Sequence, residues 1–176
     1  MLRMFGSFRS VTPAVVVLLV SGSLSSAKAE FNICNVATGL VVDVIGAQTN
    51  DLQGVILFPQ NNQKNQLFDQ AVETDGSFAL VAQHSFKCLD VDGGSDQNGT
   101  PIIQFKCHFG PNQRWTSQRI GRGVILKSVN SGKCLDARNP DFPTPPKSEA
   151  ALQQWQCISN ESERNAVNQI FQLGGC

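Results

Sequence analysis

The stretch FALVAQHSFKCLDVDGGSDQNGTPIIQFKCHFGPNQRW, residues 78–115, has a second copy in the same chain. Residues 31–68, moved forward by 47 positions, fall on it without a gap, so that Asp43 meets Asp90. Self-similarity at a fixed period of this length is typical of repeat architectures. The repeat therefore predicts the class of fold without any assignment of individual strands or helices.

A third copy begins near Val124 and carries two insertions. KCLDA at residues 133–137 falls on KCLDV of the second copy, and the ending Asn-Gln-x-aromatic recurs at residues 168–171. One insertion is the Pro-rich stretch 139–149, and the other lies around residues 160–166. We place the copies at about 31–77, 78–123 and 124–176.

The apolar runs within each copy are short and are bounded by clusters of Gly, Asn, Ser and Asp, which predicts strands and turns. No stretch sustains the 3.6-residue period of a helix. A copy of this size cannot bury its own apolar face, so the three must pack around a shared axis. The sequence predicts an all-β domain with pseudo-threefold symmetry, in which closure hides the sheet edges.

The first 29 residues have the three-part pattern of a secretory signal peptide. Arg3 and Arg9 precede the apolar run 11–20, and Ala27-Lys28-Ala29 places small residues at −3 and −1 of a cleavage site. A membrane anchor is the alternative, but the apolar run is too short to span a bilayer comfortably. We expect a secreted domain of residues 30–176.

Composition excludes several classes of partner. Beyond residue 29 the chain carries 11 basic and 14 acidic residues, so it lacks the basic surface of nucleic-acid-binding proteins. Asn and Gln are abundant and Tyr is absent, which indicates a polar, uncharged working surface. No later segment is apolar for long enough to insert into a membrane, and we expect no cofactor.

All six cysteines lie beyond the expected leader, and an even number in a secreted protein favours disulfides. A zinc site is disfavoured, because the spacings are wide and His84 and His108 are the only histidines. Cys88 with Cys107 and Cys134 with Cys157 bracket equivalent parts of two copies, so we expect these two bridges. Cys34 and Cys176 remain. They could pair with each other where the termini meet, or Cys176 could form an intermolecular disulfide.

Three repeats, each with a Leu-Asp-Val-like strand, an apolar strand ending in an aromatic residue and Asn-Gln-x-Trp/Phe, resemble the ricin B-chain type lectins. The resemblance covers residues 31–173. It implies a β-trefoil that binds galactose, N-acetylgalactosamine, xylan or related sugars. The chain departs from the family pattern, since only the second copy has Gln-x-Trp, at Gln113 and Trp115, and the first has Val41 and Gln60 at the cysteine positions.

The resemblance also implies three sugar pockets. In each, the Asp carboxylate accepts hydrogen bonds from two sugar hydroxyls, and an aromatic ring stacks on the sugar. An Asn binds a further hydroxyl, and a Gln holds the Asp in place. The residue two positions before the aromatic also faces the ligand. The candidates in the first copy are Asp43, Ile56, Phe58, Asn65 and Gln66; in the second, Asp90, Ile103, Phe105, Asn112 and Gln113; and in the third, Asp136, Gln153, Trp155, Asn168 and Gln169.

Structural roles compete with some of these assignments. We interpret Trp115, Phe68 and Phe171 as core residues and not as ligand platforms. Each Asp could instead form a turn, and Phe58 and Phe105 could pack in the core. Because an indole stacks best, we rank the third pocket first, the second close behind it and the first last.

The sequence predicts a non-catalytic, glycan-binding lectin that is a monomer unless it joins a larger complex. Acid–base groups are few, and neither Gly-x-Ser-x-Gly nor His-Glu-x-x-His occurs. The alternatives are a protease inhibitor or protein-binding trefoil with degenerate sugar sites, and the binding subunit of a toxin or enzyme complex. Asn98 and Asn160 begin N-glycosylation sequons.

Overall fold

The computed structural model describes residues 30–141, 144–158 and 167–176. The expected leader and residues 159–166 of the second insertion lie outside the described residues. The strands are β1 (Ile33–Asn35), β2 (Val41–Val44), β3 (Gln53–Phe58), β4 (Phe68–Val72), β5 (Phe78–Ala82), β6 (Cys88–Val91), β7 (Ile102–Phe105), β8 (Trp115–Ile120), β9 (Gly123–Ser128), β10 (Cys134–Ala137), β11 (Leu152–Trp155) and β12 (Phe171–Leu173). Of four short 3-10 helices, η1 (Ile45–Ala47) and η3 (Asp92–Gly94) directly follow β2 and β6, and η2 (Lys64–Gln66) and η4 (Pro111–Gln113) come just before β4 and β8.

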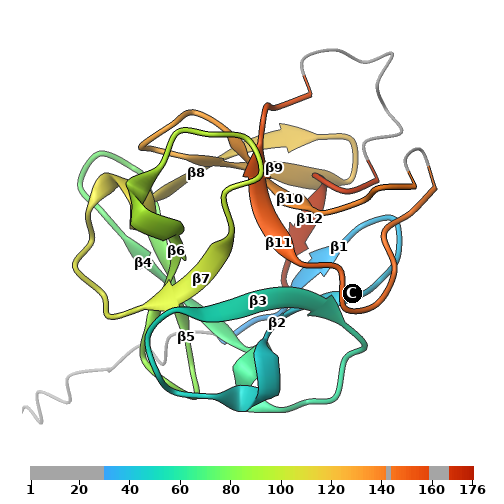
Figure 1. Cartoon of the computed structure of the whole chain (residues 1–176), viewed down its shortest axis with the longest axis horizontal. Helices are drawn as coiled ribbons and strands as arrows, with labels where there is room; N and C mark the ends of the chain where they lie inside the picture. Colours follow the sequence, from blue (N-terminus) through green and yellow to red (C-terminus); the bar gives the residue numbers. More distant parts are fainter. Residues whose placement is uncertain (1–29, 142–143, 159–166) are drawn as a thin grey trace, which may run out of the picture.

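The three copies form equivalent antiparallel hairpins, β2–β3, β6–β7 and β10–β11. Their register is the same, because Asp43 pairs with Ile56, Asp90 with Ile103, and Asp136 with Gln153. Figure 1 shows β3, β7 and β11 arranged around the centre of the molecule. The predicted all-β fold with pseudo-threefold symmetry is confirmed.

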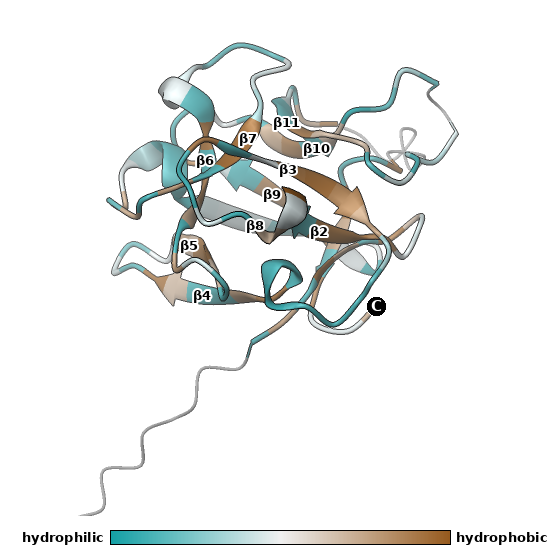
Figure 2. Cartoon of the chain, turned by 60° about the horizontal axis from the view of Figure 1, so that its bottom comes forward, coloured by the Kyte–Doolittle hydropathy of each residue, from teal (hydrophilic) through white to brown (hydrophobic). Residues whose placement is uncertain are grey.

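One aromatic residue of each copy lies in the shared core. Phe68, Trp115 and Phe171 begin β4, β8 and β12, and each has no exposed surface. Figure 2 shows apolar residues concentrated in strands such as β2 and β3, and hydrophilic residues in many of the connections. The core interpretation of these three residues agrees with their burial, so none of them is available to a ligand.

Buried glutamines join neighbouring copies at two of the three junctions. Gln104 donates to the carbonyl oxygens of Gln48 and Asn50 in the first copy, at 2.8 and 2.7 Å. Gln154 makes the equivalent bonds to Ser95 and Gln97, at 2.8 and 2.9 Å. In the first copy this position holds a leucine, so the junction between the third and first copies lacks such a glutamine.

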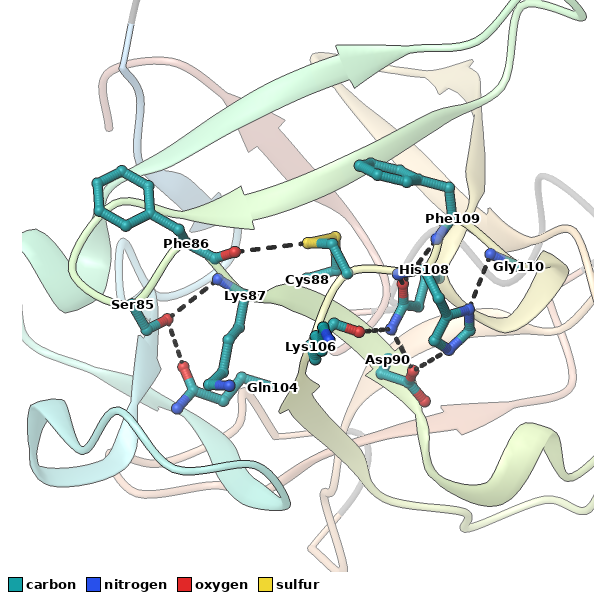
Figure 3. The surroundings of a disulfide bond; sticks show 12 residues. Ser85, Phe86, Lys87, Cys88, Asp90, Gln104, Lys106, His108, Phe109 and Gly110 are labelled. Carbon is teal, nitrogen blue, oxygen red and sulfur yellow. Dashed lines mark hydrogen bonds and ion pairs between the residues drawn. A yellow bond between two sulfur atoms is a disulfide. The ribbon is translucent and has the colours of Figure 1, made fainter.

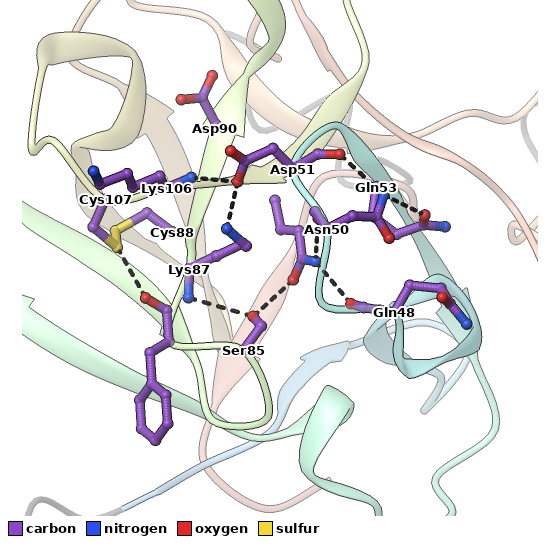
Figure 4. A network of polar contacts seen from close by, with 12 residues as sticks. Gln48, Asn50, Asp51, Gln53, Ser85, Lys87, Cys88, Asp90, Lys106 and Cys107 are labelled. Carbon is purple, nitrogen blue, oxygen red and sulfur yellow. Dashed lines mark hydrogen bonds and ion pairs between the residues drawn. A yellow bond between two sulfur atoms is a disulfide. The ribbon is translucent and has the colours of Figure 1, made fainter.

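A charged contact also links the first two copies. The Asp51 carboxylate accepts from Lys87 Nζ at 2.5 Å and from the backbone N–H of Lys106 at 2.9 Å, as Figure 4 shows. The hydrogen bond from Lys87 is the main cause that lowers the pKa of Asp51. The same loop that carries Asp51 also supplies the two carbonyl oxygens bound by Gln104.

Three disulfides close the fold. Cys88–Cys107 and Cys134–Cys157 tie the first strand of a hairpin to the residue two beyond its second strand. Cys34 in β1 is joined to Cys176 within the same chain, across 142 residues. In the described part of the chain, no helix is both long and apolar enough to span a bilayer.

Candidate functional site

Each hairpin places one aspartate at the same depth beneath the surface. Asp43, Asp90 and Asp136 are the third residues of β2, β6 and β10, and each side chain is almost fully buried. A buried carboxylate requires hydrogen-bond donors to offset its lost hydration. The fold therefore has to supply donors beside each of these strands.

The glutamine of each Asn-Gln pair is one of those donors. Gln66, Gln113 and Gln169 donate to the aspartate of their own copy, at 2.8, 2.7 and 2.8 Å. The same side-chain nitrogens also donate to the backbone carbonyl of the residue that follows Phe58, Phe105 or Trp155. The side-chain oxygens accept from backbone N–H groups in the loop after β3, β7 or β11. Each glutamine thus fixes both the carboxylate and the loop that faces it.

The asparagine of the pair behaves differently in the first copy. Asn112 and Asn168 donate to Asp90 and Asp136 at 2.8 Å, whereas Asn65 donates to the carbonyl oxygen of Val44 at 3.0 Å. Among the described residues, the Oδ1 atoms of Asn65 and Asn168 are buried without a hydrogen-bond partner. An unpaired buried acceptor is costly, so each of these two asparagines lowers the stability of its site.

A cavity of about 790 Å³ lies over the third aspartate. Trp155 forms part of its wall with 44% of its surface exposed, and Asp136, Gln153, Arg138 and Gly99 also line it. Gly99 comes from the second copy and has a positive φ of 82°. A Cβ there would lie 3.6 Å from the indole ring, so the second copy packs directly against the Trp155 side of this cavity.

The first copy also has a cavity, of about 550 Å³. Asp43, Ile56, Phe58 and Asn65 line it together with Glu149, which comes from the third copy. Phe58 and Ile56, which are both site candidates from the sequence, thus line this cavity. The rim of each cavity is completed by a neighbouring copy.

The second site has a histidine beside its carboxylate. His108 Nε2 lies 3.6 Å from Asp90 Oδ2, and the imidazole makes an edge contact with Phe105, with 6.3 Å between ring centroids. Figure 3 shows the ring between Asp90 and Gly110. Ile103 is only 5% exposed, so it offers a ligand little surface.

The sequence analysis missed the position that His108 occupies. Its equivalents are Asn61 in the first cavity and Ile158 in the third, and both line the wall. In each copy the backbone N–H of this residue is bound by the glutamine that holds the aspartate. The repeat alignment contained the signal, because this residue directly follows the second cysteine position of each copy.

Burial raises the pKa of all three carboxyl groups. For Asp43 the amide of Gln66 opposes this effect, and for Asp90 the amides of Gln113 and Asn112 do so. The pKa of Asp136 reaches about 6, because burial outweighs the hydrogen bonds from Gln153 and Gln169. The three carboxylates are thus acceptors that titrate above the usual range of Asp.

The geometry is that of three equivalent sites, of which the first and the third lie on cavities. Each has one buried carboxylate, one aromatic side chain and amide groups, an arrangement suited to ring C–H groups and hydroxyls. Among the described residues, no group of three or more His, Cys, Asp or Glu could hold a metal ion. The fifteen residues named from the sequence lie together in three sets of five, at the positions described above.

Residues 29–165 match the family of ricin-type β-trefoil lectin domains. The chain belongs to this family. Its members are carbohydrate-binding modules, and the resemblance to the ricin B-chain type lectins is confirmed. The predicted β-trefoil is confirmed as well.

Solved structures share the fold over most of this ricin-type domain. The designed threefold-symmetric protein ThreeFoil is 29% identical, with a TM-score of 0.73, covering 84% of this chain and 99% of its own. A ricin B-like lectin from Macrolepiota procera, solved in complex with lactose, is 19% identical, with a TM-score of 0.67, covering 86% and 98%. An exo-β-1,3-galactanase from Clostridium thermocellum is 23% identical, with a TM-score of 0.75, covering 86% of this chain and 31% of the enzyme.

Proposed function

We propose that residues 30–176 form a secreted, non-catalytic lectin that binds galactose-type or related glycans in up to three shallow pockets. The observation that carries this proposal is the third cavity, where an exposed indole faces the same space as a buried carboxylate. The lactose complex of the Macrolepiota procera lectin supports the choice of galactose-type sugars. Three disulfides and the leader-like first 29 residues support secretion.

In the third pocket, the roles follow from the contacts of each side chain. Trp155 stacks on the apolar face of the sugar ring, and Asp136 accepts from hydroxyl groups. Asn168 lines the pocket, and its amide nitrogen stays on Asp136. Gln169 does not touch the ligand and acts by holding the carboxylate.

Three pockets on one small domain make cross-linking the expected activity. A single shallow sugar pocket binds weakly, but linked sites gain avidity without new contacts. The hairpins that carry the pockets surround a common axis (Figure 1). One molecule could then bridge two glycan-bearing surfaces.

The test is a glycan array followed by cross-linking of galactose-bearing beads. Asp136→Ala, Asp90→Ala and Asp43→Ala remove one acceptor each, and Asp69→Ala on β4, outside the three pockets, is the matched control. Loss of a charge-assisted hydrogen bond should weaken a live site roughly tenfold to a hundredfold. We expect Asp136→Ala to have the largest effect, with free lactose competing.

Three results would contradict this proposal or one part of it. Silence of the intact protein on the array, together with capture of a protease or another protein, would favour a protein-binding trefoil. Normal glycan binding by all three aspartate variants at unchanged Tm would move the sugar sites elsewhere. Hydrolysis of an array glycan by the purified chain would contradict the non-catalytic part.

A further inference from the structure

The residue two positions after each buried aspartate differs in charge among the copies. It is Ile45 in the first copy, Asp92 in the second and Arg138 in the third. Ile45 and Arg138 line their cavities, and the charge of Asp92 is close enough to raise the pKa of Asp90. The position therefore contributes to each pocket, and its chemistry is apolar, acidic or basic.

The charges around the two cavities differ accordingly. Among the described residues, the first cavity has two carboxyl groups in its wall, Asp43 and Glu149, and no cation. The described wall of the third has one carboxyl group, Asp136, and one cation, Arg138. An anionic ligand would be repelled by the first wall and attracted by the rim of the third.

Arg138 is held at this rim by its backbone and is exposed at its side chain. Its N–H donates to the carbonyl oxygen of Ala151 at 2.8 Å, and the preceding N–H, of Ala137, donates to Asn168 at 2.9 Å. The Asp136 carboxylate is bound by three amide groups, and Arg138 forms no ion pair with another described residue. The guanidinium is thus not the counter-ion of the buried carboxylate.

We propose that the third pocket takes a sugar that carries an anionic substituent, and that Arg138 binds this group. The substituent is a carboxylate, as in a uronic or sialic acid, or a sulfate ester. A guanidinium matches such planar or multi-oxygen anions with two parallel hydrogen bonds. The inference rests on the proposed lectin function and adds to it a class of ligand for one pocket.

Fluorescence can follow this pocket alone, because the chain has two tryptophans and Trp115 is fully buried in the core. The intact protein is titrated at pH 7.5 with galactose and with galacturonic acid, which differ only at C6. We expect galacturonic acid to bind about tenfold more tightly, as a charge-assisted hydrogen bond would give. Added salt should reduce the difference.

Arg138→Gln should remove the preference for galacturonic acid over galactose. Arg119→Gln, on the exposed side of β8, is the matched control and should keep the preference. Lactose is then compared with its sialylated form, and galactose with its 6-sulfate, to separate the sources of the anion. If the sialylated or the sulfated sugar binds more tightly, and this gain is lost in Arg138→Gln, its anionic group is the one that the pocket prefers.

The outcomes separate the two proposals. Binding of galactose with equal or weaker binding of every anionic form overturns the role of Arg138 and leaves the lectin function standing. A preference that persists in Arg138→Gln also overturns it. No binding of any of these sugars, by fluorescence or by calorimetry, contradicts both proposals.

Discussion

Gln153 donates its side-chain amide to Asp136 Oδ1 at 2.9 Å, across the paired strands β11 and β10. The same register position holds Ile56 and Ile103 in the other copies. The resemblance implies that this residue faces the ligand, and Gln153 does line the cavity. Its nitrogen is engaged by the carboxylate, so Gln153 also positions Asp136, a role that neither isoleucine can have.

Replacing Gln153 with isoleucine, the residue of the other two copies, should raise the pKa of Asp136 further. The substitution removes a hydrogen bond that lowers this pKa, and the burial that raises it stays. The carboxyl resonance of Asp136, followed by NMR over a pH series, measures the change. An unmoved titration midpoint in Gln153→Ile would show that this hydrogen bond does not stabilise the ionised form.

Binding in the third pocket should weaken as the pH falls through about 6, the pKa of Asp136. The protonated carboxyl group can no longer accept on both oxygens, whereas the ionised form can. Fluorescence titrations with lactose at pH 7.5 and pH 5 measure this difference. Asp136→Asn should bind weakly at both pH values, and equal affinity of the wild type at both would contradict the role of the carboxylate.

Stability should follow the same titration with the opposite sign. The pKa of Asp136 is about 6 in the folded protein, above its ordinary 3.8, so the folded state holds the proton more tightly than the unfolded chain. The resulting stabilisation is complete below pH 4 and is lost as the pH rises through 6. In urea unfolding, the free energy of unfolding of the wild type should rise by up to about 3 kcal/mol relative to that of Asp136→Asn when the pH is lowered from 7 to 4. A constant difference between the two proteins would contradict it.

Gln104→Leu should destabilise the fold by about 1–3 kcal/mol, because it leaves the carbonyl oxygens of Gln48 and Asn50 without their donor. Leu57→Met is the matched control, because Leu57 holds the position in the first copy that Gln104 holds in the second. Leucine and methionine have similar volumes, so this change removes no hydrogen bond and little packing. Chemical denaturation measures both. If the two variants lose equal stability, the amide of Gln104 has no special role at the junction.

The long disulfide should contribute more stability than a short one. Cys34 and Cys176 are 142 residues apart, and Cys88 and Cys107 are 19 apart. In the chain-entropy model this corresponds to about 5 kcal/mol against about 3. Unfolding of the two double Cys→Ala variants tests the order. A larger loss for the short loop would show that strain or residual structure outweighs chain entropy here.

Much of the fold could be predicted because its determinants recur in the sequence. Asp43, Asp90 and Asp136 recur with the same neighbours, so one alignment placed all three beside their glutamines. Gly99 and Glu149 could not be predicted as pocket residues. Each reaches the pocket of a different copy, and the contact depends on how the copies pack around the axis and not on any local pattern.

The bond between Cys34 and Cys176 also has a mechanical consequence. A load applied to segments attached at the two ends passes directly from one sulfur to the other. The three copies between them lie outside the path of the force, and pulling cannot extend the 142-residue span while the bond is intact. Tension applied at both ends therefore leaves the hairpins folded, whereas tension applied through a glycan bound in a pocket would still load the strands.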